Sequence, residues 1–483
     1  MSKYYLTAAI PYVNGDPHLG HALEFVQGDV IARWHRLKGD EVRYITGADE
    51  NSLKVVQMAE KEGITPDALA VKYGQAFQDL ITGLNISFDA FQRSSAPNNA
   101  ETAQAMWRAC EATGDIYKKK YKGLYCVGCE AFYKKEDFNE KGDCPDGHPK
   151  SKVQEVEEEN YFFKLSKYEA QLRKLIESDE YLIRPVSRKN EALGFINQGL
   201  EDFSISRSKE RAGNWGVPVP GDDSQIMYVW FDALNVYRSA VAPEFWPANL
   251  HIIGKGIFRF HAVYWPAMLL SARLALPKEL FVHGYVTLNG TKMSKTLGNT
   301  VDPMMLVKKY GADPIRQYLL REIPADDDGD FSEEKFKIRY NADLANGLGN
   351  FASRVLTLAD KFGSVGFDYA KEAEPVITEA VAKTHQAVTD GVGKRKFHEA
   401  LNDLWKLISV GDGYVNAKKP WELTAGSTEQ RLALGQLLYV LYTVIILLEP
   451  FLPQTSATLK KHLSYQSGKF VAKKPITGLF PRL

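Results

Sequence analysis

Hydrophobic positions follow two different rhythms over the first hundred residues. Two short, nearly continuous apolar runs, residues 4–10 and 41–47, predict buried β-strands. The apolar side chains of the intervening segment, residues 21–40, recur every three or four positions, at Leu23, Val26, Val30, Trp34 and Leu37. That spacing predicts a helix with one buried face, and a second helix is expected over residues 51–63, ending at Gly63. Strand, helix and strand of these lengths indicate a parallel βαβ unit.

The pattern changes twice further along the chain. From about Tyr117 short, turn-rich strands surround three cysteines, which indicates an insertion, and the alternation of strands and helices resumes near Met227. The acidic segment Asp326 to Asp330 is most simply a solvated connection, and after about Arg339 every segment is expected to be helical. These changes divide the chain into five expected regions, residues 1–115, 116–213, 214–285, 286–340 and 341–483.

The composition is that of an ordinary globular protein without overall charge. Of 483 residues 45% are hydrophobic, and 60 Lys and Arg balance 60 Asp and Glu, so a nucleic-acid partner would have to be bound by local basic patches. The longest charge-free run, Leu432–Leu448, contains Gly435 and Gln436 and is shorter than the ~20 residues of a membrane span. We therefore expect a buried bundle helix there and no membrane partner. The first residues lack the pattern of a signal peptide, and four cysteines are few for a secreted disulfide scaffold, so we expect a cytoplasmic protein.

Two histidines stand three residues apart in PYVNGDPHLGHALEF, residues 11–25. A strand followed by a tight turn and a helix places a ligand at the carboxyl end of a sheet, and the helix N-terminus offers backbone N–H groups to a phosphate. His18 and His21 flank this position, and Gly20 lets a nucleotide approach the backbone. The two imidazoles can hydrogen-bond phosphate oxygens, or they can simply cap the helix. The stretch alone favours neither interpretation.

A second candidate stretch, NGTKMSKTLGN at residues 289–299, holds Lys292 and Lys295 in a loop flanked by Gly and Asn. Flexible lysines suit a polyanion that arrives and leaves, although an exposed basic loop without a ligand is the simpler interpretation of this stretch alone. Together, H-x-G-H early and K-M-S-K late are the paired signatures of class I aminoacyl-tRNA synthetases. The chain resembles the methionyl-tRNA synthetases over essentially its whole length. The stretches that carry the resemblance are AIPYVNGDPHLGH, YVWFDAL, FSISR, WGVPVP, RFHAVYWPAM, KMSKTLGN and NAKKPW.

The resemblance implies a fold in several parts. The expected class is α/β, with a Rossmann-like parallel-sheet catalytic domain in two halves, residues 1–115 and 214–285. A connective insertion with a zinc knuckle, residues 116–213, would split the halves. A lysine-loop and stem-contact region, residues 286–340, and an all-α anticodon-binding bundle, residues 341–483, would follow.

The resemblance also implies the chemistry. The expected activity is ATP-dependent ligation of L-methionine to tRNA(Met) through a methionyl-adenylate, with release of pyrophosphate and AMP. By this resemblance His18, His21, Lys292 and Lys295 are catalytic and, with Gly20, bind ATP together with Mg²⁺. The histidines would stabilise the transferring phosphate and the lysines the leaving pyrophosphate. Positioning and charge stabilisation supply the rate in such reactions.

Seven residues match the family's methionine-binding positions. They are Ile10, Tyr12, Asp49, Trp230, Ala233, Tyr237 and His261. Asp49 matches the carboxylate that binds the ammonium group, and aromatic rings around a soft sulfur are a physically sensible selector. Without the family, Trp230 and Tyr237 would indicate core packing, because a separation of seven is helical spacing.

Three cysteines and a histidine have the spacing of a zinc site. Cys126, Cys129, Cys144 and His148 form C-x2-C followed by C-x3-H, which supplies three thiolates and an imidazole to one structural Zn²⁺. A redox-active C-x-x-C pair is the rival interpretation, but the βαβ context that such a motif needs is missing. The C-x3-H arm is less usual in the family than C-x2-C or C-x2-H, so the cysteines are the firmer ligands. Cys110 lies in a helical stretch and is expected in the core.

The resemblance assigns three residues to the tRNA anticodon. Asn350 and Arg354 match residues that contact anticodon bases, and Trp421 matches a stacking platform. Asn350 and Arg354 are four apart and therefore share a helix face, which by itself would indicate an ordinary solvated surface.

The family's usual residues are replaced at four places, where this chain has Thr296 for Ser, Asn51 for His, Ser52 for Gly and Gly256 for an acidic residue. The last change bears on the adenosine contacts. We also expect a monomer, since the sequence has no appended dimerisation domain after the helical bundle of residues 341–483.

Three other functions agree with parts of the sequence, but each agrees less well than methionine–tRNA ligation. A ligase for another small apolar amino acid is disfavoured by Tyr12, Trp230 and His261. A catalytically silent tRNA-binding protein on the same fold is disfavoured by the retained histidines and lysines. A small nucleotidyltransferase shares the H-x-G-H turn, but it has no use for the zinc knuckle or the helical bundle.

Overall fold

The computed structural model describes residues 2–127, 131–133, 135–145, 148–292, 301–474 and 478–483. The chain forms two compact units, and each is considered by itself. The first unit comprises residues 1–17, 38–81 and 87–283. The second comprises residues 18–37, 82–86 and 284–483.

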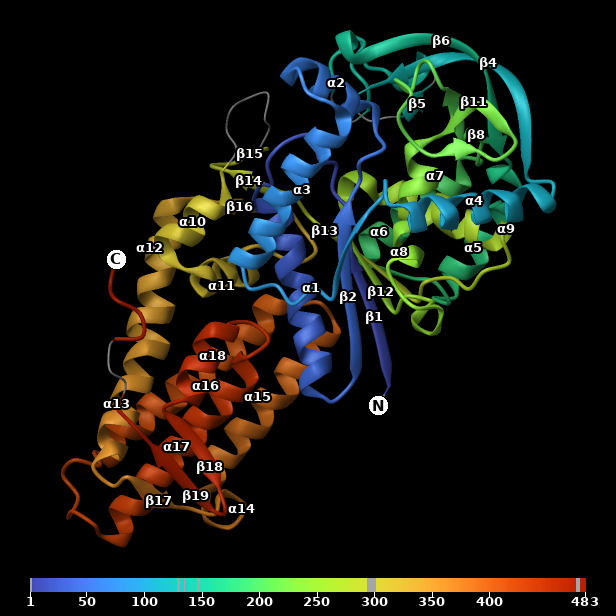
Figure 1. Ribbon diagram of the computed structural model, residues 1–483. Helices are drawn as coiled ribbons and strands as arrows, with labels where there is room; N and C mark the ends of the chain where they lie inside the picture. The colour runs from blue at the N-terminus through green and yellow to red at the C-terminus, as the bar shows by residue number, and fades with distance from the viewer. Residues whose placement is uncertain (1, 128–130, 134, 146–147, 293–300, 475–477) are drawn as a thin grey trace. The chain divides into compact units, whose positions relative to one another are not determined.

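A six-stranded sheet forms the centre of the first unit (Figure 1). Its strands, in spatial order, are β3 (Ala90–Arg93), β2 (Glu41–Ala48), β1 (Lys3–Ala8), β12 (Leu250–Gly254), β13 (Glu279–His283) and β7 (Leu182–Arg184). Every neighbouring pair is parallel. The inner strands are buried along most of their length, as expected for a parallel sheet covered on both faces. The Rossmann-like parallel sheet expected from the sequence is confirmed.

The segment between the two halves of this sheet contains two smaller antiparallel sheets. One has the order β5 (Ala131–Tyr133), β4 (Ile116–Cys126), β6 (Val153–Phe163), β8 (Phe203–Ser204). The other has the order β10 (Pro218–Val219), β11 (Asp222–Met227), β9 (Ser206–Ser208). β7 comes from the same segment of the chain but joins the edge of the main sheet beside β13.

Helices complete the first unit. They are α2 (Leu53–Glu62), α3 (Pro66–Gly83), α4 (Pro97–Ala112), α5 (Glu169–Glu177), α6 (Val186–Asn197), α7 (Val229–Ala233), α8 (Val236–Ser239) and α9 (Trp265–Ser271). The end of α2 follows the sequence signal, since Gly63 takes the left-handed φ of 69° and its N–H bonds back to the last turn. Cys110 is buried as expected, and burial raises the pKa of its thiol to about 12.

The second unit is mainly helical. Its helices are α1 (Leu19–Leu37), α10 (Pro303–Tyr310), α11 (Ala312–Glu322), α12 (Glu333–Arg339), the π-helix η8 (Tyr340–Gly349), α13 (Asn350–Asp360), α14 (Tyr369–Glu372), α15 (Pro375–Gly393), α16 (Phe397–Lys418), α17 (Thr428–Leu448) and α18 (Pro453–Lys460). In Figure 1 the long helices α15, α16 and α17 pack side by side. The expected helical bundle is confirmed.

Two small sheets interrupt the helices of this unit. β14 (Val286–Leu288), β15 (Thr291–Lys292) and β16 (Gly329–Phe331) form one, and β17 (Ser364–Gly366), β19 (Lys469–Ala472) and β18 (Leu463–Gln466) form the other. The expectation that every segment after Arg339 is helical is therefore wrong for β17, β18 and β19. The β18–β19 strands form a hairpin around Ser467 and Gly468, which both have positive φ, a turn signal in YQSGKF that outweighed helical periodicity.

α17 is the one described helix that is long and apolar enough to cross a membrane. Of its apolar window 67% is buried against other helices of the unit, so it serves as the bundle helix that the sequence indicated. α1 also follows its predicted stripe, except that Leu37 at its end is exposed. A buried ion pair joins α1 to α11, with Arg316 Nη1 2.8 Å from Asp29 Oδ2.

Candidate active site

The histidine pair forms the N-terminus of α1. The backbone N–H of Gly20 donates to His18 Nδ1 at 3.1 Å, and the backbone N–H of His18 donates to His21 Nδ1 at 3.1 Å. This pattern is an imidazole variant of the capping box, in which the cap residue's ring accepts from the N–H of the second helical residue and the ring of the third helical residue accepts from the N–H of the cap residue. The capping interpretation of the two histidines is therefore correct as a description of the geometry.

Capping also fixes which nitrogen of each histidine carries the proton. Because both Nδ1 atoms accept hydrogen bonds, a neutral ring of either residue carries its proton on Nε2. The rings stack with centroids 3.9 Å apart and 21° between their planes, so the two Nε2 donors belong to one rigid pair. Gly20 is required for this arrangement, since a Cβ there would lie 2.9 Å from His18 Cε1. Capping and phosphate binding thus use opposite nitrogens and do not exclude each other.

The lysine motif begins on a tight hairpin. Lys292 lies in β15, which pairs with β14 across Asn289 and Gly290, both with positive φ as a two-residue turn requires. Lys295 and Thr296 lie outside the described residues. Asp330 Oδ1 accepts from the N–H of Gly290 at 2.6 Å and from the Thr287 hydroxyl at 2.8 Å. Burial alone would raise the Asp330 pKa, but these hydrogen bonds lower it. The acidic segment is therefore more than a solvated connection, because its last residue holds the turn before the lysines.

The seven residues matched to methionine binding all lie in the first unit. The end of β2 is extended by a parallel bridge between Tyr12 and Asp49, and the Asp49 N–H donates to the Pro11 carbonyl at 2.9 Å. Asp49 is only 2% exposed. A buried carboxylate at a strand end suits a cationic group, because opposite charges attract strongly where water is excluded. Ile10 is half-buried just before this bridge, and Ala233 is buried at the end of α7.

Five rings pack around this strand end and are called the aromatic cluster, namely Tyr12, Trp230, Tyr237, Phe260 and His261. Trp230 is the central member. It stacks on Phe260 at 3.9 Å and meets Tyr12 and His261 edge to face, at 6.2 and 6.1 Å. Trp230 and Tyr237 lie on separate short helices, α7 and α8, so their spacing of seven does not reflect one helix.

Tyr237 and His261 form a hydrogen-bonded pair inside the cluster. The Ile257 carbonyl can only accept, so His261 Nδ1, 3.0 Å away, carries the proton. Burial lowers the pKa of His261 to about 4, so the ring is neutral near pH 7 and its Nε2 accepts from the Tyr237 hydroxyl at 2.9 Å. The pair therefore presents a polar but uncharged surface.

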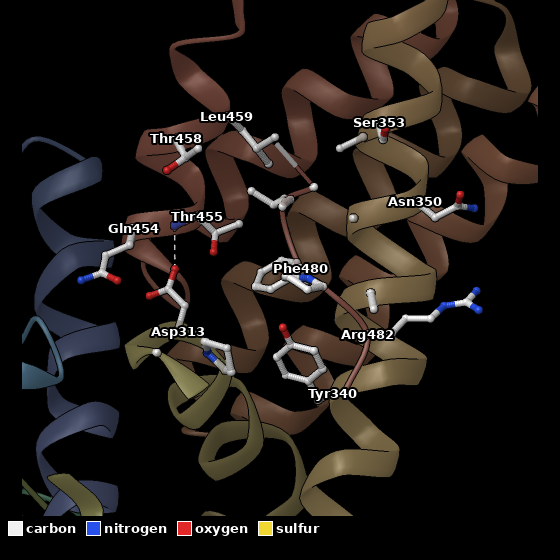
Figure 2. Close-up of a pocket in the computed structure, with 18 of the residues that line it drawn as sticks. Asp313, Tyr340, Asn350, Ser353, Gln454, Thr455, Thr458, Leu459, Phe480 and Arg482 are labelled. Atoms are coloured by element: carbon white, nitrogen blue, oxygen red, sulfur yellow. Dashed lines mark hydrogen bonds between the residues drawn. The ribbon is translucent and has the colours of Figure 1, made fainter. Parts of the chain in front are cut away.

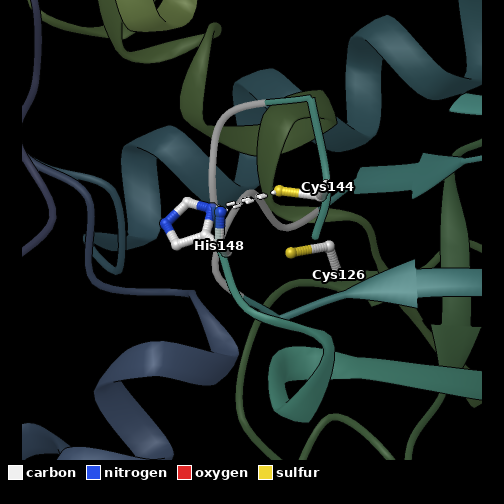
Figure 3. Close-up of side chains that lie close together, drawn as sticks. All are labelled: Cys126, Cys144 and His148. Atoms are coloured by element: carbon white, nitrogen blue, oxygen red, sulfur yellow. Dashed lines mark hydrogen bonds between the residues drawn. The ribbon is translucent and has the colours of Figure 1, made fainter. Parts of the chain in front are cut away.

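Three of the four expected zinc ligands fall within the described residues, and they lie together. The ligand atoms of Cys126, Cys144 and His148 are all within 4.8 Å of one another. Figure 3 shows two hydrogen bonds between Cys144 and His148, one between Cys144 Sγ and His148 Nδ1 at 3.4 Å and one donated to Cys144 Sγ by the His148 backbone N–H at 3.3 Å. Ligands of a tetrahedral zinc ion lie about 3.8 Å apart, given Zn–S bonds of ~2.3 Å. The donor set and its spacing thus fit Zn²⁺. Cys129 lies outside the described residues.

Comparison with known proteins identifies the family. The family described as tRNA synthetases class I (M) matches residues 4–155 and 148–356, and the anticodon-binding domain of tRNA ligase matches residues 375–477. Methionine–tRNA ligase of Brucella suis biovar 1 is 42% identical over 486 residues, covering 97% of this chain and 93% of the relative. The enzyme of the same name from Thermotoga maritima is 39% identical and covers 96% and 76%. A solved Mycobacterium tuberculosis methionyl-tRNA synthetase, in complex with methionyl-adenylate, matches with a TM-score of 0.93 at 36% identity over the whole of both chains. The chain belongs to the methionine–tRNA ligase family of class I tRNA synthetases.

Asn51 and Ser52, which replace the family's usual residues just after β2, both make side-chain hydrogen bonds. The Asn51 side-chain amide donates to Asp232 Oδ2 at 2.8 Å, which ties the end of β2 to α7. Ser52 caps α2, its hydroxyl accepting from the Val55 N–H at 3.3 Å. Both residues therefore satisfy local polar groups. Gly256 lies exposed in a short helical turn, Lys255–Ile257, one residue before the carbonyl that binds His261.

The residues matched to anticodon recognition lie on the second unit, where Asn350 and Trp421 are exposed and Arg354 contacts a neighbouring helix. Asn350 and Arg354 lie on α13, where Arg354 contacts α16 through Asp412 at 3.2 Å and Asn416 at 2.9 Å. Trp421 follows α16 and is 51% exposed, the expected state for a stacking platform. A cavity of about 1200 Å³ lies beside the start of α13 (Figure 2). Its lining includes Asn350 and the basic residues Lys461, Lys474 and Arg482.

Sequence reasoning missed several neighbours of the methionine positions. Phe260, which stacks on Trp230, directly precedes His261 and could have been found from that adjacency. Lys54 places its Nζ 4.2 Å from the centroid of the Tyr12 ring, a contact that no local sequence pattern predicts. Tyr5, Tyr181 and His251 each contact Tyr237 or His261, and the sequence around them does not indicate these contacts.

Proposed function

We propose that this chain activates L-methionine with ATP and transfers it to tRNA(Met). The observation that carries the methionine specificity is the aromatic cluster with its neutral Tyr237–His261 pair. A thioether is soft and uncharged, and aromatic contacts with sulfur stabilise it by about 0.3–1.5 kcal/mol each. A charged side chain would find no counter-ion in this pair. Asp49, at the end of β2, is assigned to the ammonium group of the amino acid.

In the first step the methionine carboxylate attacks the α-phosphorus of ATP. A bond forms between a carboxylate oxygen and phosphorus, and the bond from phosphorus to the bridging oxygen breaks, so pyrophosphate leaves with the electron pair. We assign the Nε2–H groups of His18 and His21 to hydrogen bonds with the phosphate oxygens on which charge builds up. Lys292 and Lys295 are assigned to the departing pyrophosphate. ATP carries Mg²⁺, which shares its charge.

In the second step a ribose hydroxyl of the terminal tRNA adenosine, the 2′-hydroxyl in this class, attacks the carbonyl of the adenylate. The new ester bond forms as the bond between the carbonyl carbon and the phosphate oxygen breaks, AMP leaves with the electron pair, and the hydroxyl proton passes to the departing phosphate, so no protein nucleophile is needed. Holding the hydroxyl oxygen close to the carbonyl carbon supplies most of the rate. Asn350, Arg354 and Trp421 are assigned to the anticodon, where an amide and a guanidinium can read exposed base edges and an indole can stack on a base.

A structural zinc ion completes the proposal. Cys126, Cys129, Cys144 and His148 would hold it, and the close approach of the three described ligands supports the assignment. The ion would crosslink the loop after β5 to the end of β4, and it would take no part in either chemical step. We further propose that the protein acts as a cytoplasmic monomer.

Exchange of labelled pyrophosphate into ATP tests the first step without tRNA. The protein is incubated with ATP, Mg²⁺ and each of a panel of amino acids. Exchange that depends on methionine alone supports the proposal, and its loss in His21→Ala would link it to the histidine pair. If folded protein gives no exchange with any amino acid, the ligase function is wrong and a silent tRNA-binding protein takes its place.

A further inference from the structure

Two buried tyrosine hydroxyls hold the backbone of the Tyr237–His261 pair. The hydroxyl of Tyr5 donates to the Tyr237 carbonyl at 2.5 Å, and that of Tyr181 donates to the His261 carbonyl at 2.8 Å. Tyr5 lies in β1, at the centre of the main sheet, and Tyr181 immediately precedes β7, at its edge. The two members of the pair are thus anchored from β1 and from the residue before β7, at two separate places of one sheet.

These hydroxyls are not required for filling the core. Both tyrosines are fully buried, and phenylalanine would occupy the same volume without a polar group that needs a partner. Burial raises the pKa of Tyr5 and of Tyr181, so both groups stay protonated and remain donors. Each donates to a carbonyl that is distant in sequence and belongs to a residue of the pair itself.

The Tyr237 ring is supported on a third side. His251, on β12, packs its ring 4.6 Å from that of Tyr237, and its Nδ1 is 2.7 Å from the Thr7 hydroxyl on β1. Burial keeps the pKa of His251 well below its usual value, so it adds no charge next to His261. Strands β1 and β12, together with the residue before β7, therefore support the Tyr237 ring and the backbone carbonyls of both residues of the pair.

We propose that Tyr5 and Tyr181 are positioning residues that set the selectivity of this protein for methionine over its sulfur-free analogue. The inference rests on the proposed function. It adds that the 2.9 Å hydrogen bond between Tyr237 and His261 keeps its geometry because the sheet holds the carbonyl of each partner. When a hydroxyl is removed, the backbone of one partner is released and its carbonyl loses a buried donor. The rings can then shift relative to the amino-acid side chain, and the preference for sulfur falls.

The test compares Tyr5→Phe, Tyr181→Phe and the double variant in amino-acid-dependent pyrophosphate exchange. Methionine and norleucine are the two substrates, because norleucine replaces the sulfur with a methylene. Each variant should lower the ratio of kcat/KM for methionine to that for norleucine by about two- to tenfold, a range bounded by the net contribution of one buried hydrogen bond. The KM for ATP should stay within about twofold, since neither hydroxyl is assigned to the nucleotide.

Tyr168→Phe is the matched control. Tyr168 is a buried tyrosine of the same unit whose hydroxyl donates to Asp115, away from the pair. It should lower the thermal midpoint without changing the methionine-to-norleucine ratio. The inference is overturned if Tyr5→Phe and Tyr181→Phe also lower only the thermal midpoint. If one variant fails to fold, the other still tests whether the hydrogen bond that it removes contributes to selectivity. If the parent protein shows no methionine-dependent exchange, the proposed function itself has failed, and this result is distinct from an unchanged ratio.

Discussion

A methyl group at Gly20 is expected to remove catalysis while leaving the fold nearly as stable. In Gly20→Ala the new Cβ would lie 2.9 Å from His18 Cε1 and 3.0 Å from His18 Nδ1, so the imidazole must turn away. The hydrogen bond from the residue 20 N–H to the ring is then lost, which costs about 1 kcal/mol as for other helix caps. Alanine regains up to ~1 kcal/mol over glycine within a helix. The free energy of unfolding should therefore change by less than about 1 kcal/mol.

The same rotation misplaces the His18 Nε2–H. Loss of one preorganised donor at a reacting group costs about 3–4 kcal/mol, so methionine-dependent pyrophosphate exchange should fall by ~10²–10³-fold. Exchange and urea unfolding are measured on the same preparation. Gly194→Ala is the control, because Gly194 is exposed on α6 with open space around its Cβ position. The reasoning is refuted if Gly20→Ala keeps more than half of the parent's exchange, or if its lost activity simply follows lost stability.

Three further predictions concern protonation, metal and tRNA. Because the pKa of His261 is about 4 in the native state and ~6.5 in the unfolded chain, the unfolded chain alone takes up this proton as the pH falls between these values. The free energy of unfolding, measured with urea, should thus fall by up to ~3 kcal/mol as the pH drops from 6.5 to about 4. In His261→Gln the free energy of unfolding should depend less steeply on pH. Equal slopes for the variant and the parent protein would contradict the assignment. Metal analysis should find one zinc per chain, and both a chelator and Cys126→Ser should release it and lower the thermal midpoint; a metal-free parent protein would rule the site out. Trp421→Ala should raise the KM for tRNA about tenfold, since a stacked base contributes ~1–3 kcal/mol, with unchanged pyrophosphate exchange; an unchanged KM would exclude the stacking role.

Local signals predicted those parts of the fold that depend on neighbouring residues. The first βαβ elements and the left-handed cap at Gly63 were predictable because hydrophobic spacing and glycine act within a few residues. The Asn-Gly pair before Lys292 is such a signal as well, because it predicts the turn of a β-hairpin at a place where only a loop was expected. β7 could not be predicted in the main sheet, because its partner β13 lies about a hundred residues further along the chain.

The candidate site shows the same division. Pairs such as H-x-G-H and C-x-x-C are candidate sites in the sequence because the residue types stand at a fixed spacing. The tautomers of His18, His21 and His261 could not be predicted, since they depend on which backbone group happens to face each ring nitrogen. The hydrogen bonds from Tyr5 and Tyr181 to the Tyr237–His261 pair could not be predicted either, because the sequence around a buried tyrosine does not indicate which carbonyl its hydroxyl binds.

Charging of tRNA(Met) with labelled methionine tests the proposed function most directly, because it requires both chemical steps and both units. The protein is incubated with ATP, Mg²⁺, methionine and tRNA(Met), and with a transcript whose anticodon bases are replaced. We expect methionyl-tRNA to form with tRNA(Met), in amounts that match AMP released, and to fall sharply with the altered transcript. Methionine-dependent pyrophosphate exchange without any charged tRNA(Met), or equal charging of both transcripts, would contradict the proposed function.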